Sequence, residues 1–339
     1  RTFHHNTKRR SWFVYLPYYW RSFLRIIMRV IFIDTVHEVL QNRLQAAGFT
    51  CIDATHLDLN SLIPELSTAD GIVIRSKYRM DANILDHAPK LKFIARSGAG
   101  MENIDIEYCE TRNIQLFNAP EGNRNAVGEH ALGMLLSLFN RLHLADREVR
   151  NGTWDREGNR GYELDGKTIG IIGYGNNGGA FAKKLSGFDV KVLAYDKYKS
   201  DYGDQYVSEA SMEQIYREAD VLSFHIPQNE ETIFMADEVY FKKFEKPIYV
   251  INLARGKIID TKALVSGLEQ GTILGACLDV LEYEKSSFES FFEQNLDPAF
   301  KYLLESEKVL LTPHVGGWTH ESYFKLSDVL ADKILAHFG

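Results

Sequence analysis

The sequence is poor in cysteine and has no long apolar run. Its three cysteines, Cys51, Cys109 and Cys277, lie far apart and form no C-x-x-C pair. We therefore expect no disulfide framework, and we expect a reducing, cytoplasmic setting. No stretch of about 18 uncharged apolar residues occurs, so we predict no membrane span. Neither H-E-x-x-H nor a Cys/His cluster is present, so no metal site is predicted either.

Basic residues are outnumbered, with 39 Lys and Arg against 46 Asp and Glu and a net charge of −7. This balance argues against nucleic acid as a partner. Residues 1–27 are the exception, because they contain six Lys or Arg and no acidic residue. From Met28 the chain reads M-R-V-I-F-I-D, a charge followed by an apolar β-like run. We expect Met28 to be the natural start and residues 1–27 to be a non-native or disordered extension. The alternative is a basic-aromatic segment for membrane-surface binding or targeting.

Short apolar runs alternate with longer helical stretches along the 339 residues. Strands are predicted at 29–34, 71–75, 92–96, 168–172, 191–195, 221–225, 248–252, 275–279 and 308–312. Helices are predicted at 36–47, 81–87, 125–150, 177–187, 211–217, 261–270 and 319–337. Alternating strands and helices with fully apolar strands are typical of α/β proteins with parallel sheets covered on both faces, and the length suffices for two domains.

The segment 117–125, F-N-A-P-E-G-N-R-N, is rich in turn-forming residues and interrupts the alternation, so we predict a domain crossing there. The helix predicted over 125–150 is apolar on more than one face. Two explanations fit this pattern: packing against another subunit, or a place in the core of its own subunit.

Residues 168–180 read T-I-G-I-I-G-Y-G-N-N-G-G-A, a strand that runs into three spaced glycines and then a helix. Gly173 permits a tight turn, Gly175 lets the backbone approach a pyrophosphate, and Gly178 lets the helix pack close to the strand. The helix N-terminus offers N–H donors and the positive end of its dipole to phosphate groups. In this context the pattern predicts a dinucleotide site.

Asp196 follows the next predicted strand, 18 residues after Gly178. An acid at this place bonds the adenosine ribose hydroxyls and repels a 2′-phosphate, so NAD is the predicted cofactor. Lys197 and Lys199 are close enough in sequence to soften that preference.

Three later strands each end in polar residues at the edge where open α/β sheets bind ligands. They contribute Arg255, then Asp279 and Glu284, then His314. Hydride transfer on a 2-hydroxy acid needs a cation for the carboxylate, an acid/base for the hydroxyl proton, and a carboxylate that orients the base and stabilises its cationic form. Arg255, His314 and Glu284 supply one of each, with Glu282 as the alternate carboxylate.

These motifs together resemble the D-isomer-specific 2-hydroxyacid dehydrogenases, which include D-3-phosphoglycerate dehydrogenase. The resemblance covers nearly all of 28–339 and rests on R-S-G-A-G-M-E-N-I-D, G-Y-G-N-N-G, N-L-A-R-G, L-D-V-L-E-Y-E and T-P-H-V-G-G-W-T, in family order. It implies two Rossmann-like doubly wound parallel-sheet domains, with an NAD domain, 119–316, inserted into a discontinuous substrate domain, 28–118 and 317–339. It also implies a substrate cleft that closes between the domains and a homodimer formed through the NAD domain.

The resemblance assigns roles to individual residues. Arg255 matches the substrate-binding arginine, Glu284 the partner carboxylate and His314 the acid/base. The substrate carboxylate is expected on the loop formed by Ser97, Gly98, Ala99 and Gly100. The cofactor is expected to contact, besides the three glycines and Asp196, the residues Asn176, Asn177, His225, Ile226, Pro227, Leu253, Ala254, Asp279, His314 and Gly317.

Two departures from the family bear on the substrate. Residues 285–308 form an aromatic insertion that we expect to be a loop near the active site, and Trp318 stands where phosphoglycerate enzymes often carry a small residue. Arg75, Lys77 and Arg79 follow a substrate-domain strand and either bind a substrate phosphate, as in 3-phosphoglycerate, or are ordinary solvated charges.

Two other functions stay open. One is reduction of glyoxylate, hydroxypyruvate or another 2-oxo acid with the same machinery. The other is a non-enzymatic NAD(H)-sensing regulator.

Overall fold

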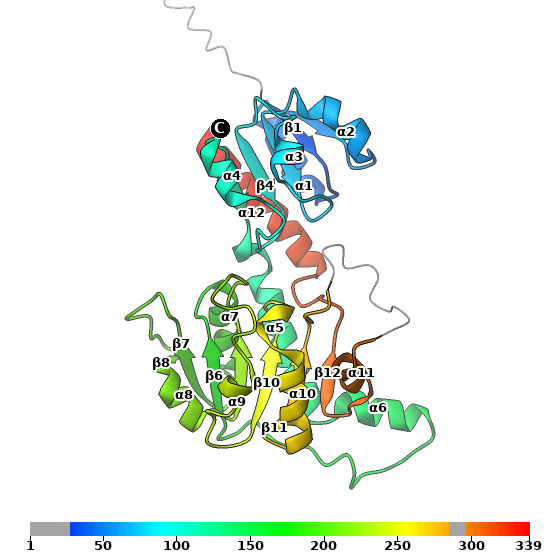
Figure 1. Ribbon diagram of the computed structural model, residues 1–339, viewed down its shortest axis with the longest axis vertical. Coiled ribbons are helices and arrows are strands. Elements are labelled where there is room, and N and C mark those ends of the chain that lie inside the picture. Colours follow the sequence, from blue (N-terminus) through cyan, green and yellow to red (C-terminus); the bar gives the residue numbers. More distant parts are fainter. Residues whose placement is uncertain (1–27, 285–295) are drawn as a thin grey trace, which may run out of the picture.

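The computed structural model describes residues 28–284 and 296–339 and builds them into two units that lie one above the other in Figure 1. Each unit contains a sheet whose strands all pair in parallel. The expected fold class, two doubly wound parallel-sheet domains, is confirmed. Residues 1–27, where we expect an extension, and the first half of the insertion lie outside the described residues.

The first unit contains five strands in the order β2-β1-β3-β4-β5. Its strands are β1 (Arg29–Phe32), β2 (Thr50–Asp53), β3 (Gly71–Ile74), β4 (Phe93–Arg96) and β5 (Gln115–Asn118). Its helices are α1 (Glu38–Ala46), α2 (Leu59–Leu66), α3 (Ala82–Leu85) and α4 (Ile106–Thr111). Sequence reasoning missed β2, β5, α2 and α4, because β2 and β5 are short and only partly buried and α2 and α4 span few turns.

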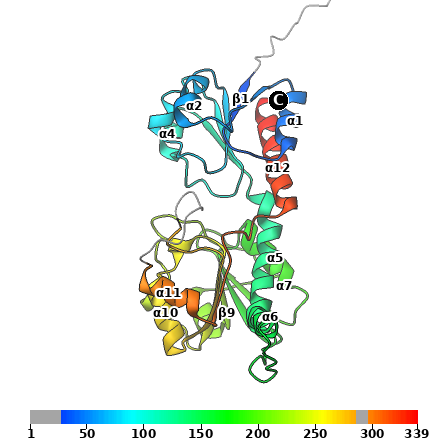
Figure 2. The same ribbon diagram turned by 90° about the vertical axis from the view of Figure 1, so that its right-hand side faces the viewer.

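The last helix of the chain, α12 (His320–Phe338), completes the first unit. Its residues Leu326, Leu330 and Ile334 are buried in one apolar cluster with Val30 and Phe93. Figure 2 shows α12 beside α1, and these two helices are in contact. The two ends of the described chain therefore share one core.

The second unit contains seven strands in the order β12-β11-β10-β9-β6-β7-β8. They are β6 (Thr168–Ile172), β7 (Lys191–Tyr195), β8 (Ser208–Glu209), β9 (Val221–Phe224), β10 (Ile248–Asn252), β11 (Ile273–Leu278) and β12 (Val309–Leu311). The helices are α5 (Pro120–Phe139), α6 (Leu142–Arg150), α7 (Asn176–Leu185), α8 (Met212–Glu218), α9 (Glu238–Phe241), α10 (Thr261–Gln270) and α11 (Pro298–Glu305). The first six strands follow the order 3-2-1-4-5-6 of dinucleotide-binding sheets, with β12 added at one edge.

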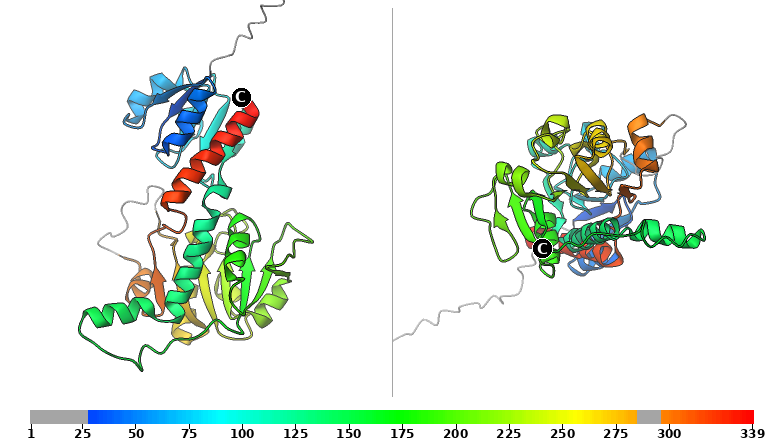
Figure 3. Two further views of the ribbon diagram at one scale, coloured as in Figure 1. Left: turned by 180° about the vertical axis from the view of Figure 1, so that it is seen from behind. Right: turned by 90° about the horizontal axis from the view of Figure 1, so that it is seen from below.

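The single helix expected over 125–150 is wrong in both its start and its continuity. The helix α5 begins already at Pro120, because proline is favoured in the first turn of a helix, where its missing N–H costs nothing. It ends at Phe139, and Arg141 takes a left-handed conformation with φ 52° before α6 begins. The α6 helix then projects sideways from the second unit, as both views of Figure 3 show.

The apolar faces of α5 are explained within its own subunit. Ala131, Leu135 and Phe139 are buried against the sheet residues Ile169 and Ile171. The helix also packs against α7 and α12, and glycines allow both approaches. A Cβ on Gly128 would lie 3.0 Å from the Ala180 backbone, and one on Gly122 would lie 2.7 Å from Leu326 N. Of the two explanations for its apolar pattern, the core position is the one that the structure supports.

The second half of the insertion is also not the loop that we expected. Residues 298–305 form α11, whose Ala299 and Leu303 belong to the core of the second unit. Asp297 accepts a hydrogen bond from the Ala299 N–H and starts the helix. The expectation of an active-site loop is therefore wrong for this half, while 285–295 is not described.

Within the described residues no helix has the length and apolar character needed to cross a membrane. Nor does this part of the chain group three or more His, Cys, Asp or Glu side chains where they could hold a metal ion.

Candidate active site

The His314 ring and the Glu284 carboxylate lie within ion-pair distance of each other at the carboxyl edge of the second sheet. His314 follows β12, and its Nδ1 lies 2.6 Å from Glu284 Oε2. The other oxygen of Glu284 accepts a hydrogen bond of 2.6 Å from the Leu281 N–H, so both carboxylate oxygens are held. The backbone of His314 has φ 54°, a conformation that non-glycine residues rarely adopt and that is found where a site demands it.

The alternate carboxylate, Glu282, has a different task. Its Oε2 accepts a hydrogen bond of 3.0 Å from the Thr261 N–H at the start of α10. The geometry therefore pairs His314 with Glu284 and leaves Glu282 at a helix start.

Arg255 lies in the turn after β10, and this turn packs against the segment that carries Glu284. A Cβ on Gly256 would lie 2.0 Å from the Leu281 carbonyl, so this turn touches the segment that leads to Glu284. Asn252 fixes the same turn by donating to Arg255 O at 2.9 Å and accepting from Ala254 N at 3.0 Å. The residues expected to bind the substrate and move its proton are thus brought to one edge of the sheet.

The Arg255 guanidinium reaches the first unit, where it meets the glycine loop after β4. A Cβ on Gly100 would lie only 2.1 Å from Arg255 Nη2, so only glycine leaves room for this approach. Glu102, two residues further on, accepts a hydrogen bond of 2.5 Å from Arg255 Nε. Neighbouring charge, chiefly that of Arg255, outweighs burial and lowers the pKa of Glu102. Sequence reasoning used the glycines of R-S-G-A-G-M-E and missed Glu102.

A second guanidinium, from Arg96, lies over the same loop. A Cβ on Gly98 would lie 1.8 Å from Arg96 Nη1, and Arg96 Nε donates to Arg75 O at 3.2 Å. Burial lowers the pKa of Arg96 to about 10, and the neighbouring charges of Arg255 and Arg75 act in the same direction. Three guanidinium groups therefore influence one another around this loop, and Arg96 was also missed although it opens the motif.

The basic residues after β3 do not act together. Asp34 holds their backbone, because its Oδ2 accepts hydrogen bonds from the N–H groups of 75, 76 and 77. Lys77 Nζ donates to Thr55 O and Leu57 O, and 72% of the Arg79 side chain is exposed. Phosphate binding by these residues, one of the two explanations given for them above, stays a prediction.

Arg75 lies against the tryptophan that departs from the family pattern. Its guanidinium carbon is 4.2 Å from the centre of the Trp318 ring, a cation–π contact. Trp318 follows the His314 turn, and its ring also packs edge-on against Tyr323. Trp318 thus contacts a positive charge of the first unit.

Asp279 is buried, with 3% exposure, and holds the turn that carries His314. Its Oδ1 accepts from Thr312 Oγ1 at 2.6 Å and from Val315 N at 2.9 Å. Its Oδ2 accepts from Gly316 N at 2.8 Å. The expected contact with the cofactor stays a prediction, and the observed bonds give Asp279 a structural task. His130, on α5, completes this network through Thr312 Oγ1 at 3.0 Å.

The glycine turn after β6 has the geometry expected of a pyrophosphate cradle. Gly173 has φ 92°, and a Cβ there would lie 2.6 Å from His225 O. A Cβ on Gly178 would lie 2.1 Å from Gly173 O, so the helix α7 packs directly on the strand end. A Cβ on Gly175 would meet no atom within 4 Å, so space is open above the turn.

Polar groups around this turn fit a bound dinucleotide. Asn177 Oδ1 is buried without a hydrogen-bond partner, next to the N-terminus of α7. Asn176 Oδ1 lies 3.4 Å from Arg124 Nη1, so a cation that sequence reasoning missed stands beside the predicted phosphate site. Asp196, after β7, accepts from Tyr174 N at 2.9 Å and Tyr198 N at 3.0 Å, which places its carboxylate beside the glycine turn.

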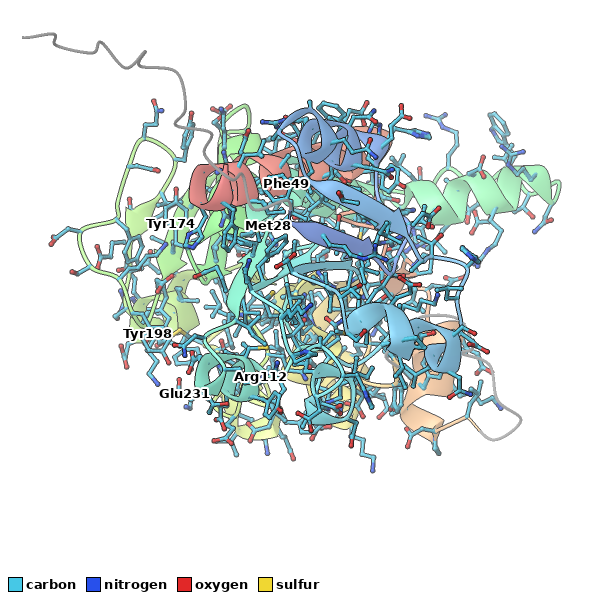
Figure 4. All side chains as sticks on the ribbon, turned by 90° about the horizontal axis from the view of Figure 1, so that it is seen from above. Met28, Phe49, Arg112, Tyr174, Tyr198 and Glu231 are labelled. Carbon is cyan, nitrogen blue, oxygen red and sulfur yellow. The ribbon has the colours of Figure 1, made fainter. Side chains whose placement is uncertain are left out.

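The two lysines near Asp196 are already bonded. Lys197 pairs with Glu231 at 2.7 Å, and Lys199 donates to Tyr174 O at 2.6 Å. Figure 4 shows Tyr198 and Glu231 together at the edge of the molecule, where the tyrosine hydroxyl donates to the carboxylate. Neither lysine is bonded to Asp196 in the structure, and the exclusion of a 2′-phosphate by this carboxylate stays a prediction.

The other residues expected at the cofactor lie at the same edge. His225 follows β9, and its Nε2 lies 2.8 Å from Ser223 Oγ. Burial lowers the pKa of His225 to about 4, so this ring is neutral at pH 7. Ile226 and Pro227 continue the chain from there. Leu253 and Ala254 are buried in the turn before Arg255, and Gly317 packs on α5, where a Cβ would lie 2.5 Å from Asn123 Nδ2.

Comparison with known proteins adds independent information. The family described as D-isomer specific 2-hydroxyacid dehydrogenase, NAD binding domain, matches residues 132–316. The glyoxylate reductase of Pyrococcus furiosus is 33% identical over 284 residues, which are 81% of each chain. The D-3-phosphoglycerate dehydrogenase of Archaeoglobus fulgidus is 32% identical over 310 residues, 91% of this chain but 57% of that protein's length.

Solved structures share the fold over almost the whole chain. The D-lactate dehydrogenase of Aquifex aeolicus, in complex with NAD and lactic acid, has a TM-score of 0.76 and 26% identity. The alignment covers 91% of this chain and 94% of that one. The sheet order, the glycine turn and these relatives agree, and the chain belongs to the family of NAD-dependent D-isomer-specific 2-hydroxyacid dehydrogenases.

Proposed function

We propose that this chain moves a hydride between NAD(H) and the 2-carbon of a small D-2-hydroxy or 2-oxo acid. The observation that carries the proposal is that the His314–Glu284 pair and the Arg255 turn lie at the same edge of the second sheet, with the Arg255 guanidinium beside Gly100 of the first unit. The family membership supports an oxidoreductase acting on a CH–OH group.

The side chains divide the work of reduction among them. Arg255 binds the substrate carboxylate and polarises the carbonyl oxygen, since a guanidinium offers parallel donors in a plane. Bound NADH supplies the hydride to the 2-carbon. His314 donates a proton from Nε2 to the oxygen, while Glu284 holds Nδ1 and stabilises the charged ring. Oxidation reverses each of these transfers.

We propose a substrate with a second acidic group, such as 3-phosphoglycerate, as the first candidate. Arg75 supports it, because a further cation close to the glycine loop suits an anion beyond the carboxylate. Reduction of glyoxylate or hydroxypyruvate is the second candidate. The bonds of Lys77 to Thr55 and Leu57 favour it, since that lysine is turned to other partners.

A substrate panel tests the activity. The purified chain is incubated with NADH and, separately, pyruvate, glyoxylate, hydroxypyruvate and 3-phosphohydroxypyruvate, and NADH consumption is followed at 340 nm. Turnover of any of them supports the proposal, and the ratio of kcat/KM values distinguishes the two candidates. Tight NADH binding without turnover would instead support the NAD(H)-sensing regulator.

Two variants test the residues. Arg255→Ala and His314→Ala are each expected to lower kcat/KM by about 10²–10⁴-fold, because each removes a group that acts on the reacting atoms. Near-normal rates in either variant would contradict its assigned role.

We also propose the domain boundaries 28–118 with 317–339 for the substrate domain and 119–316 for the NAD domain. The shared core of α12 and the first sheet supports the discontinuous domain. The free thiols Cys51, Cys109 and Cys277 support a cytoplasmic location.

A homodimer formed through the NAD domain is the proposed assembly. The projecting α6 and the segment after it expose large apolar side chains: Leu142 (56%), Val149 (51%), Trp154 (79%) and Tyr162 (64%). Exposed apolar side chains of this size on an extended arm suit burial against a second copy of the chain.

A further inference from the structure

Glu102 occupies the guanidinium that the proposed function assigns to the substrate. Its Oε1 lies 2.5 Å from Arg255 Nε, and a Cβ on Gly100 would lie 2.1 Å from both Glu102 Oε2 and Arg255 Nη2. Carboxylate and guanidinium thus lie together against the loop on which the substrate carboxylate is expected. A substrate cannot bond fully to Arg255 while this internal carboxylate holds it.

The glycine loop also contacts a second guanidinium, that of Arg96. Arg96 Nη1 lies over Gly98, and Arg255 Nη2 lies over Gly100, two residues along the same loop. The negative charge of Glu102 favours the cationic form of Arg96, so carboxylate and second guanidinium interact electrostatically. Glu102 therefore lies within the influence of both cations but bonds only Arg255.

Arg96 is short of negative partners. Among the described residues it forms no ion pair within 4.0 Å, and its one side-chain hydrogen bond goes to Arg75 O. Arg75 and Arg255 place two further positive charges near it, and burial also disfavours its charge. A cation in this position gains free energy from any carboxylate that comes to it.

We propose that Glu102 exchanges Arg255 for Arg96 when a 2-oxo or 2-hydroxy acid binds, so that Glu102 sets the affinity of the enzyme for the substrate carboxylate. The proposal rests on the proposed function of Arg255. An arriving carboxylate repels Glu102 at short range and takes the Arg255 donors. Glu102 then neutralises Arg96, which offsets part of the free energy lost when its first ion pair breaks.

This exchange makes Glu102 a positioning residue with a defined kinetic signature. Because Glu102 competes with the ground-state substrate for Arg255, it raises KM without taking part in the chemistry. Removing the competitor lowers KM and leaves kcat nearly unchanged. A residue that merely supports the loop would, on removal, raise KM or lower kcat.

The first test measures KM, kcat and the inhibition constant of oxamate, an unreactive analogue, in the wild type and in Glu102→Gln and Glu102→Ala. We expect KM and the oxamate constant to fall about three- to tenfold in both variants, the range for a partly exposed charge-assisted pair, with kcat within about threefold. Glu107→Gln, an exposed acid on the adjacent α4, is the matched control and leaves all three constants unchanged. Unchanged or raised KM in both Glu102 variants would overturn the proposal.

The second test asks whether Arg96 receives Glu102. Arg96→Met is expected to raise KM about three- to tenfold in the wild type but less than about twofold in Glu102→Gln, since only Glu102 needs that partner. Arg96→Lys keeps the charge and is expected to raise KM less than Arg96→Met, and melting temperatures report whether each variant folds. An equal effect of Arg96→Met in both backgrounds would make Arg96 a direct substrate ligand and overturn the exchange. A wild type without turnover on any 2-oxo acid would instead contradict the proposed function itself.

Discussion

At the scale of single residues, neighbouring acids of one sequence run have separate tasks. Glu284 bonds His314, while Glu282, two positions earlier, bonds the start of α10. The chain turns at this run, where the Glu284 N–H donates to Leu281 O at 3.1 Å, and the two side chains reach different partners. The same chemical group therefore acts in the proposed proton transfer at one position and in helix capping at the other.

This difference predicts the outcome of a matched pair of variants. Glu284→Gln is expected to lower kcat by about 10–100-fold, because the amide no longer stabilises the charged His314 ring. Glu282→Gln should leave kcat within about twofold and lower the free energy of unfolding by about 0.3–1 kcal/mol, because the amide oxygen still accepts from Thr261 N–H and only the negative charge at the helix start is lost. Steady-state kinetics and urea unfolding of both proteins measure these effects. Equal kinetic losses would show that the pairing seen here is not the working one.

His225 makes stability depend on pH. Its pKa is lowered from 6.5 to about 4 by burial, so between these values the unfolded chain binds more protons than the folded protein. Neutral His225 therefore makes its full contribution to the free energy of unfolding above pH 6.5. That contribution is lost as the pH falls through this window.

His225→Gln removes this titration. The melting temperature of the variant is expected to fall less steeply than that of the wild type between pH 6.5 and pH 4. Carboxylates also titrate there, so the difference between the two curves is the measurement. Parallel curves would exclude His225 as a source of the pH dependence.

At the scale of secondary-structure elements, the turn from β6 to α7 joins stability and ligand binding in three glycines. Gly173 and Gly178 are required by backbone contacts, whereas Gly175 faces open space. Packing therefore explains Gly173 and Gly178, whereas ligand binding is the expected reason for Gly175.

Substitution by alanine separates these reasons. Gly178→Ala is expected to lower the free energy of unfolding by about 1–3 kcal/mol or more, because its Cβ would lie 2.1 Å from Gly173 O. Gly175→Ala, with φ −108°, should keep the melting temperature and weaken NADH binding about tenfold or more. Thermal unfolding and NADH fluorescence titration measure the two effects. Undiminished NADH affinity in Gly175→Ala would argue against a pyrophosphate above this turn.

At the scale of the whole molecule, α5 and α12 connect the two units. Gly122 on α5 approaches the α12 backbone, and Lys333 on α12 bonds Glu121 at 2.9 Å. The opposite end of the second unit carries the exposed apolar arm on α6. Contacts within the chain and the proposed contact between chains are therefore made by different helices.

The proposed dimer is tested on this arm. The double variant Val149→Asp, Trp154→Asp places charges on the exposed apolar surface and is expected to convert a dimer into a monomer in light scattering after gel filtration. Val239→Asp, an equally exposed site on α9, is the control and should keep the dimer mass. A wild-type monomer, or a dimer that survives the double variant, would contradict the proposed interface.

Features of this protein that depend on local chemistry are predictable from the amino-acid sequence. Short segments suffice to predict the alternation of strands and helices, the glycine turn after β6 and the candidate residues Arg255, Glu284 and His314, because turn geometry and side-chain chemistry act over a few residues. The exact extents of α5, α6 and α11 could not be read, since a left-handed Arg141 and the burial of Leu303 depend on packing.

Contacts between side chains that are distant in sequence depend on the three-dimensional fold. Glu102 and Arg255 are 153 residues apart in sequence, and Arg75 meets Trp318 across a still longer separation. Such pairs form because two sheets bring their loops to one junction, and no pattern in either segment reports the partner. Local sequence thus supplies the side chains of the site, while folding determines which charged groups lie next to one another.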